Sequence, residues 1–230
     1  SKSQRVDANT TVQFVFRSYH VLFVLDMSPS VARLDMSTKR SLSKNFYESM
    51  RMLILCLIQQ FTVGGRMMSP DIFISVIALD SSLTPTKTLM DGCYLTLASV
   101  SEILQTLDRR FDALQDHIAL STIPSVSTES LTGVDFRTLL QSSILALERL
   151  PSAAPVVFLI SDGVLSVPSG GLSDPFSQQL LRNDIQCNII QITSTAFHPH
   201  LTYGYLSDHD ALRFFAHQTG GKFYEANLFS

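Results

Sequence analysis

The sequence is short of charge, cysteine and long hydrophobic runs, and it contains no tryptophan. Only 16% of its 230 residues are charged and the net charge is −3, whereas an average soluble domain carries roughly 25% charged residues. The sequence has no cluster of Lys and Arg that would form a positively charged surface and attract nucleic acids or acidic membranes. We therefore expect no nucleic-acid partner.

The apolar runs are also too short to cross a membrane. The longest, such as 52–58 and 156–160, fall well below the roughly 20 residues that span a bilayer. Residues 1–11 are polar and lack the apolar core of a secretory signal. We expect no direct membrane insertion, a cytoplasmic location, and a domain excised from a larger protein.

The three cysteines are widely spaced along the chain. Cys56, Cys93 and Cys187 fit neither a disulfide framework nor the ligand spacing of a zinc site. We expect all three to be buried free thiols, which is the usual state of unpaired cysteine in a core.

Apolar strands alternate with amphipathic helices throughout. Residues 20–25 (HVLFVL) and 155–160 are almost unbroken apolar runs, typical of strands that are covered on both faces of a parallel sheet. The alternation predicts one α/β domain over 1–230, with a Rossmann-like, mostly parallel central sheet and helices on both faces. Residues 1–10 are expected to be a flexible segment, and the Ser/Thr-rich stretch 118–133 a loop. Further strands are predicted at 11–16, 72–79, 185–192 and 222–225, with a short one formed by 88–90 together with residues 94 and 95. Helices are predicted at 41–61, 99–114 and 136–150 and from residues 174 and 207.

Polar side chains follow the two most apolar strands. Asp26, Ser28 and Ser30 (DMSPS) follow the first strand, and their alternation projects them to one side if the backbone stays extended. Asp162 follows the second strand. If the two strands are neighbours, both carboxylates lie at the carboxyl edge of the sheet, where such folds bind ligands. Carboxylates and hydroxyls are hard oxygen ligands, which suit Mg²⁺ or Mn²⁺.

These residues resemble a known family. DMSPS, ISDG at 160–163 and FAHQTGGKFYEA at 215–226 are similar to the DxSxS loop, the second aspartate motif and the last helix and strand of von Willebrand factor A domains. The resemblance covers about residues 12–226, and proline stands at position 29 where the family usually has glycine.

The resemblance implies a metal-ion-dependent adhesion site (MIDAS). Its ligands would be Asp26, Ser28, Ser30, a threonine of the middle loop and Asp162, and its Mg²⁺ would recruit an acidic residue of a protein partner. Thr122, Thr128 and Thr132 all lie in the middle loop. We choose Thr132 because it directly precedes the helix expected to begin near residue 135.

A closer resemblance covers LDMSPS, ILALERLPS and ISDGVLSVPS. These stretches are similar to the A-like domain of a cytosolic scaffold subunit in nutrient signalling through TOR. That similarity implies other subunits of a large complex as partners, and recruitment to the lysosomal surface.

Two alternatives remain open at this point. The domain could be purely structural, with a vestigial, metal-free site. A haloacid-dehalogenase-like phosphotransferase also places an aspartate after its first strand, but it normally has a second acid two residues later, where this chain has Ser28. No G-x-S-x-G elbow or phosphate-binding glycine loop is present. We therefore predict that the protein is not an enzyme.

Overall fold

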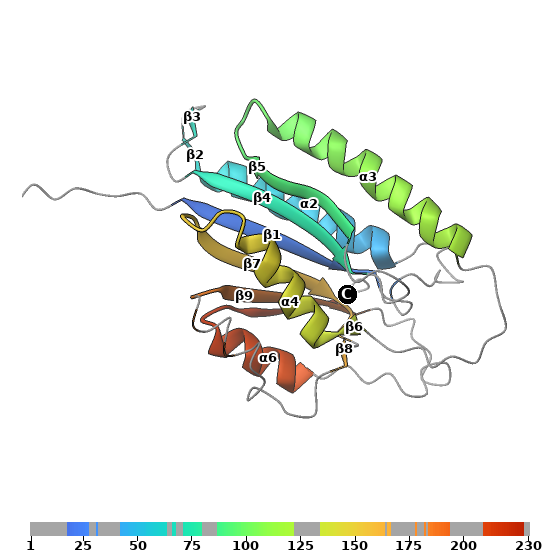
Figure 1. The fold of residues 1–230 in the computed structure, drawn as a ribbon. Helices are drawn as coiled ribbons and strands as arrows, with labels where there is room; N and C mark the ends of the chain where they lie inside the picture. The colour runs from blue at the N-terminus through green and yellow to red at the C-terminus, as the bar shows by residue number, and fades with distance from the viewer. Residues whose placement is uncertain are drawn as a thin grey trace, which may run out of the picture.

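Six strands form one sheet in the order β10-β9-β7-β1-β4-β5 (Figure 1). The computed structural model describes residues 18–27, 31, 42–63, 66–67, 71–79, 87–121, 134–163, 165–166, 178, 182, 184–193 and 209–227. Neighbouring strands are parallel, except that β5 runs antiparallel to β4. The mostly parallel α/β sheet predicted from the sequence is therefore confirmed. The strands are β1 Tyr19–Asp26, β4 Ile72–Leu79, β5 Lys87–Tyr94, β7 Ala154–Ser161, β9 Gln186–Thr193 and β10 Phe223–Asn227.

Strand β1 lies inside the sheet because its side chains are apolar on both faces. Val21, Phe23 and Leu25 belong to one core cluster, whereas Leu22 and Val24 belong to the other. All five side chains are at most 4% exposed. Burial on both faces explains why this run shows no alternation of apolar and polar residues.

Helices cover both faces of the sheet, and Figure 1 shows α2 and α4 on opposite sides of it. Helices α2 (Leu42–Gln60) and α3 (Val100–Ser121) contribute Phe46 and Phe111 to the first core cluster. Helices α4 (Phe136–Leu147) and α6 (His209–Gln218) contribute Ile144 and Phe215 to the second. The expected helices on both faces are thus confirmed.

Helix α3 is longer than the sequence pattern indicated. It continues past residue 114 to Ser121, so the first residues of the segment 118–133, predicted to be a loop, are helical. The added turns are tied to α2, because Gln115 Nε2 donates a 3.1 Å hydrogen bond to Ser43 Oγ. The apolar spacing also continues into these turns, because Ile118 packs against the first core cluster four residues after Leu114.

The outward side of α2 corrects two expectations. We expected the helix to be largely buried and Cys56 to be an internal thiol, but Met52 is 60% exposed and Cys56 is exposed. Cys93 is half-buried, and only Cys187 is fully inside. The physical reason is that a helix on a sheet buries one side, and here the opposite side is also apolar.

Strand β5 is one continuous edge strand with a bulge. Its pairing with β4 shifts register between Ile74 and Val76, which places Asp91 and Gly92 opposite Ser75. Gly92 adopts a φ of 55°, a conformation that glycine adopts without steric cost. The bulge interrupts the period of the strand, which is why the sequence indicated only a short strand here.

One backbone carbonyl of β5 is hydrogen-bonded by a side chain from α3. Arg110 Nη1, from α3, donates a 2.6 Å hydrogen bond to the carbonyl oxygen of Leu89. An edge strand normally presents its outward carbonyls to solvent. In β5, the carbonyl oxygen of Leu89 already accepts a hydrogen bond from Arg110 of the same chain.

Short pairings complete the described structure. β2 (Thr62–Val63) pairs antiparallel with β3 (Arg66–Met67), and β6 (Val134–Asp135) pairs parallel with β8 (Leu165–Ser166). The predicted flexible segment 1–10, the strand at 11–16 and the start of the helix at 174 lie outside the described residues. In the part that the structure describes, no helix has the length and apolarity needed to span a membrane.

Candidate metal site at the carboxyl end of the sheet

The two predicted carboxylates follow adjacent parallel strands. β1 and β7 pair in register, with Leu25 opposite Ile160, so Asp26 and Asp162 come to the same edge of the sheet. Asp26 is fully buried and Asp162 is 5% exposed. The strand adjacency on which the sequence argument depended is therefore present.

Ser161, the last residue of β7, links the ends of β1 and β7. Its Oγ donates a 2.7 Å hydrogen bond to Asp26 Oδ2 and accepts a 3.0 Å hydrogen bond from Gly163 N. Ser161 thus orients a buried carboxylate and fixes the turn after β7. Ser161 was not predicted from the sequence, although a hydroxyl directly before Asp162 at the end of a buried strand was a visible signal.

A second residue missed from the sequence supports Asp162 from the other side. Gln191, on β9, is fully buried, and its Nε2 donates a 3.1 Å hydrogen bond to the carbonyl oxygen of Asp162. This bond holds the backbone at the point where the chain leaves β7. The signal was a polar amide inside the apolar strand NIIQIT, because a buried amide requires hydrogen-bond partners.

The loop after β1 is anchored at its start. Met27 N donates a 2.8 Å hydrogen bond to the carbonyl oxygen of Leu79, which extends the pairing of β1 with β4 by one residue. Met27 and Val31 are both buried. The predicted ligands Ser28 and Ser30 lie between these two buried residues but outside the described part of the chain.

The middle segment reaches the same edge through β6. Val134 pairs with Leu165, two residues beyond Gly163, so the chain that enters α4 lies beside the loop that follows β7. The predicted ligand Thr132 lies two residues before Val134 and outside the described residues. The short β6–β8 pairing was not predicted from the sequence.

The described candidate donors at this edge are the carboxylates of Asp26 and Asp162 and the hydroxyl of Ser161, all of them oxygen donors. Two carboxylates and hydroxyl groups fit a hard divalent cation such as Mg²⁺ or Mn²⁺. Among the described residues, no three His, Cys, Asp or Glu side chains group closely enough to hold a metal ion. The described residues therefore offer no closed zinc site of thiolates and imidazoles.

Comparison with known proteins gives matches at the level of structure. No family model matches the chain. The human COPII-coat protein Sec24c is 14% identical with a TM-score of 0.59, and the match covers 94% of this chain and 30% of that one. The SpRpn10 VWA domain is 12% identical with a TM-score of 0.54, over 93% and 89% of the two chains.

A third structure relates the fold to metal binding. It is proximal thread matrix protein 1 from the mussel byssus, with a zinc-occupied MIDAS motif, which is 13% identical with a TM-score of 0.54 over 91% of this chain and 42% of that one. Sheet order, helices on both faces and these matches define the class: the chain has the fold of a von Willebrand factor A domain. At 12–14% identity these matches establish the fold of this protein and not its activity.

Proposed function

We propose that this protein is an interaction module that binds another protein through a divalent metal ion. Asp26, Ser28, Ser30, Thr132 and Asp162 would hold Mg²⁺ or Mn²⁺, and an acidic residue of the partner would complete its coordination. A metal held by few anionic ligands stays electrophilic, which favours a carboxylate from outside. In this proposal the protein binds and does not catalyse.

The observation that carries the proposal is the placement of Asp26 and Asp162. They lie 136 positions apart in the sequence and follow adjacent strands. Buried carboxylates are costly unless they are compensated by hydrogen bonds or a cation. Ser161 supplies one hydrogen bond to Asp26, and a divalent cation would supply the charge compensation that a hydroxyl cannot.

The setting that we propose is an intracellular scaffold. The stretch SDGVLSVP at 161–168 resembles the A-like domain of the seizure threshold two protein, a subunit of the KICSTOR scaffold in TOR nutrient signalling. Loop residues beyond the aspartate vary widely among A domains, so a likeness there is informative. Partners would then be other subunits of that large complex, at the lysosomal surface.

Calorimetric titration of Mg²⁺ and Mn²⁺ tests the metal site. We expect saturable binding by the unaltered protein and its loss in Asp26→Asn, which keeps the side-chain shape but removes the charge. Asp91→Asn is the matched control, because Asp91 is an exposed aspartate on β5 and should leave metal binding unchanged. Equal heats for the unaltered protein and Asp26→Asn would overturn the proposal.

The metal-free alternative has its own supporting observation. Ser161 already donates to Asp26, so the carboxylate is partly compensated by the protein alone. In that case the free energy of unfolding would be the same in Mg²⁺ and in EDTA, because a ligand stabilises a protein only if it binds the native state. Turnover of a simple phosphoester that Asp26→Asn abolishes would instead support the phosphotransferase.

A further inference from the structure

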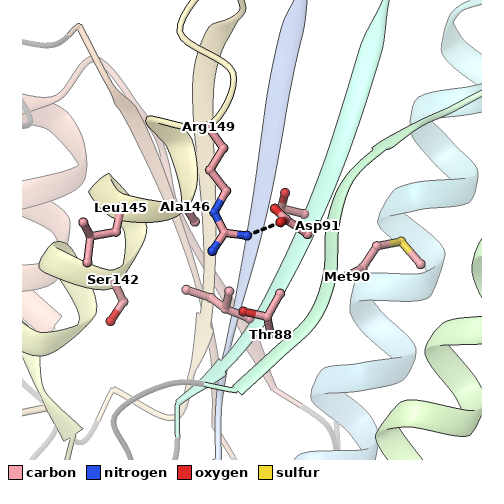
Figure 2. Close-up of a pocket in the computed structure, with 9 residues that line it drawn as sticks. Thr88, Met90, Asp91, Ser142, Leu145, Ala146 and Arg149 are labelled. Carbon is pink, nitrogen blue, oxygen red and sulfur yellow. Dashed lines mark hydrogen bonds and ion pairs between the residues drawn. The ribbon is translucent and has the colours of Figure 1, made fainter.

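A pocket of about 140 Å³ opens between α4 and the β4–β5 side of the sheet (Figure 2). It lies on the face that α4 covers, and none of its lining residues is a predicted metal ligand. Its volume resembles the roughly 150 Å³ engineered cavity that admits benzene. The pocket is therefore large enough for a group of about six non-hydrogen atoms.

The mouth of the pocket presents one negative and one positive group. Asp91, on β5, and Arg149, just after α4, form an ion pair across it (Figure 2). The two side chains are 41% and 58% exposed, and exposed ion pairs contribute only about 0–1 kcal/mol. Opening this pair to admit a ligand that pairs with both groups therefore costs little.

The two charges restrict which ligands fit. A simple anion would be attracted by Arg149 but repelled by the carboxylate of Asp91. A simple cation would be attracted by Asp91 but repelled by Arg149. A ligand that carries both charges a few ångströms apart can pair with both residues at once. The mouth is thus complementary to a zwitterion.

The interior of the pocket combines apolar side chains with the hydroxyl groups of Ser75, Thr88 and Ser142. Ile77 and Ala146 come from β4 and α4, and Leu145 stands at the edge with its side chain 58% exposed. The side chain of Met90 points away, toward α2 (Figure 2). An aliphatic group of a few carbons placed here would bury apolar area at about 25 cal/mol per Å².

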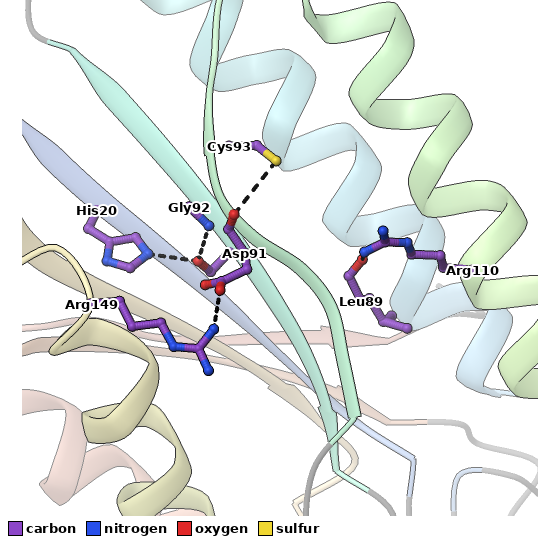
Figure 3. A network of polar contacts seen from close by, with 8 residues as sticks. His20, Leu89, Asp91, Gly92, Cys93, Arg110 and Arg149 are labelled. Carbon is purple, nitrogen blue, oxygen red and sulfur yellow. Dashed lines mark hydrogen bonds and ion pairs between the residues drawn. The ribbon is translucent and has the colours of Figure 1, made fainter.

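A buried polar network fixes the mouth. Ser75, on β4, accepts a 2.8 Å hydrogen bond from Gly92 N and lies 2.8 Å from His20 Nε2 (Figure 3). Ser75 and His20 are both fully buried. The network holds the bulge that places Asp91 opposite Arg149, so the charged mouth is set by the core of the protein and not by the exposed side chains alone.

We propose that this pocket binds a free α-amino acid with an aliphatic side chain. The ammonium group would pair with Asp91, the carboxylate with Arg149, and the side chain would lie against Ile77 and Ala146. The proposal does not depend on the metal site, since the two share no residue.

Titration followed by amide NMR shifts, with L-leucine as the probe, tests this site. We expect saturable shifts at Gly92 and Arg149, and the same affinity in Mg²⁺ and in EDTA. N-acetyl-L-leucine lacks the cation, L-leucinamide lacks the anion and glycine lacks the side chain. Each should bind at least about tenfold more weakly, which corresponds to about 1.4 kcal/mol.

Two substitutions on α4 distinguish binding in the pocket from binding elsewhere on the surface. Ala146→Leu places a larger side chain in the pocket and should abolish the shifts, whereas Gln141→Leu adds the same side chain at an exposed position of α4 and should not. Thermal unfolding of both variants checks that they fold. Absence of saturable shifts with L-leucine, equal affinity for the blocked analogues, or unchanged binding by folded Ala146→Leu would each overturn the proposal.

Discussion

Ser161 Oγ donates a hydrogen bond to Asp26 Oδ2 at 2.7 Å, between residues that are 135 positions apart in the sequence. The bond joins the carboxyl ends of β7 and β1 at the edge where metal binding is proposed. Both residues are fully buried. The position of the Asp26 carboxylate therefore depends on a residue that is not itself a predicted ligand.

Ser161→Ala should lower the free energy of unfolding by about 1–3 kcal/mol, because it leaves an oxygen of a buried carboxylate without this donor. Urea unfolding measures the change. Ser152→Ala, at an exposed position before β7, is the control and should have little effect. If both variants unfold at the same urea concentration as the unaltered protein, Ser161 does not support Asp26.

Gly221 should not tolerate a side chain. A Cβ atom there would lie 2.0 Å from the carbonyl oxygen of Cys187, which is backbone and cannot move aside cheaply. We expect Gly221→Ala to cost about 3 kcal/mol or more of unfolding free energy.

The adjacent glycine offers a matched comparison. Gly220 has a φ of 73° but nothing within 4 Å of the added Cβ, so Gly220→Ala should cost only the backbone term of about 1 kcal/mol. Chemical denaturation of the two variants side by side measures the difference. Equal losses would show that contact with Cys187 does not control this turn.

Stability should fall as the pH is lowered below about 6.5. Burial lowers the pKa of His20 below that ordinary value, and the carboxylate of Asp91 and the backbone carbonyl of Leu147 only partly oppose this. The unfolded chain therefore binds a proton before the folded protein does, and stability is lost as the pH falls toward the folded pKa of His20.

Unfolding free energies measured across pH 5–8 test this behaviour. His20→Asn should lose stability overall but show a shallower decline with falling pH. His217→Asn, at an exposed position of α6, should keep the decline of the unaltered protein. A decline of the same steepness in all three proteins would exclude His20 as its source.

The three thiols should differ in reactivity under native conditions. Burial raises the pKa of the Cys187 thiol to about 12, and both protonation and lack of access suppress attack by its sulfur. Cys56 is exposed on α2 and should be alkylated first. Mass spectrometry after timed iodoacetamide treatment locates the labels, and labelling of Cys187 before Cys56 would contradict the structure.

The central strands could be predicted well from the sequence because almost all of their residues are apolar. HVLFVL in β1 and the run at 72–79 are apolar at nearly every position, and that pattern has few alternative structures. Asp26 and Asp162 could be identified for the same reason, since each directly follows such a run. That the two strands before Asp26 and Asp162 are neighbours could only be assumed, because the local sequence pattern does not determine the order of strands in a sheet.

The features that could not be predicted depend on contacts between distant residues. Ser75 and His20 are 55 positions apart, and nothing near either residue in the sequence indicates the other. The bulge at Gly92 disturbs the period of β5, so the strand was recognised only in part. The exposure of Cys56 depends on which side of α2 meets the sheet, and both sides are apolar.

The contact between Arg110 and the carbonyl of Leu89 makes the two borders of the sheet unequal. Strands can join a sheet only through free backbone groups at a border. Open fibres require head-to-tail contacts between two different surfaces, whereas a contact between identical surfaces closes as a dimer. Among the described strands β10 pairs only with β9, so a contact between two identical β10 borders would join two copies and stop there. At the other border, the Arg110 guanidinium already occupies the carbonyl oxygen of Leu89 before any strand is added.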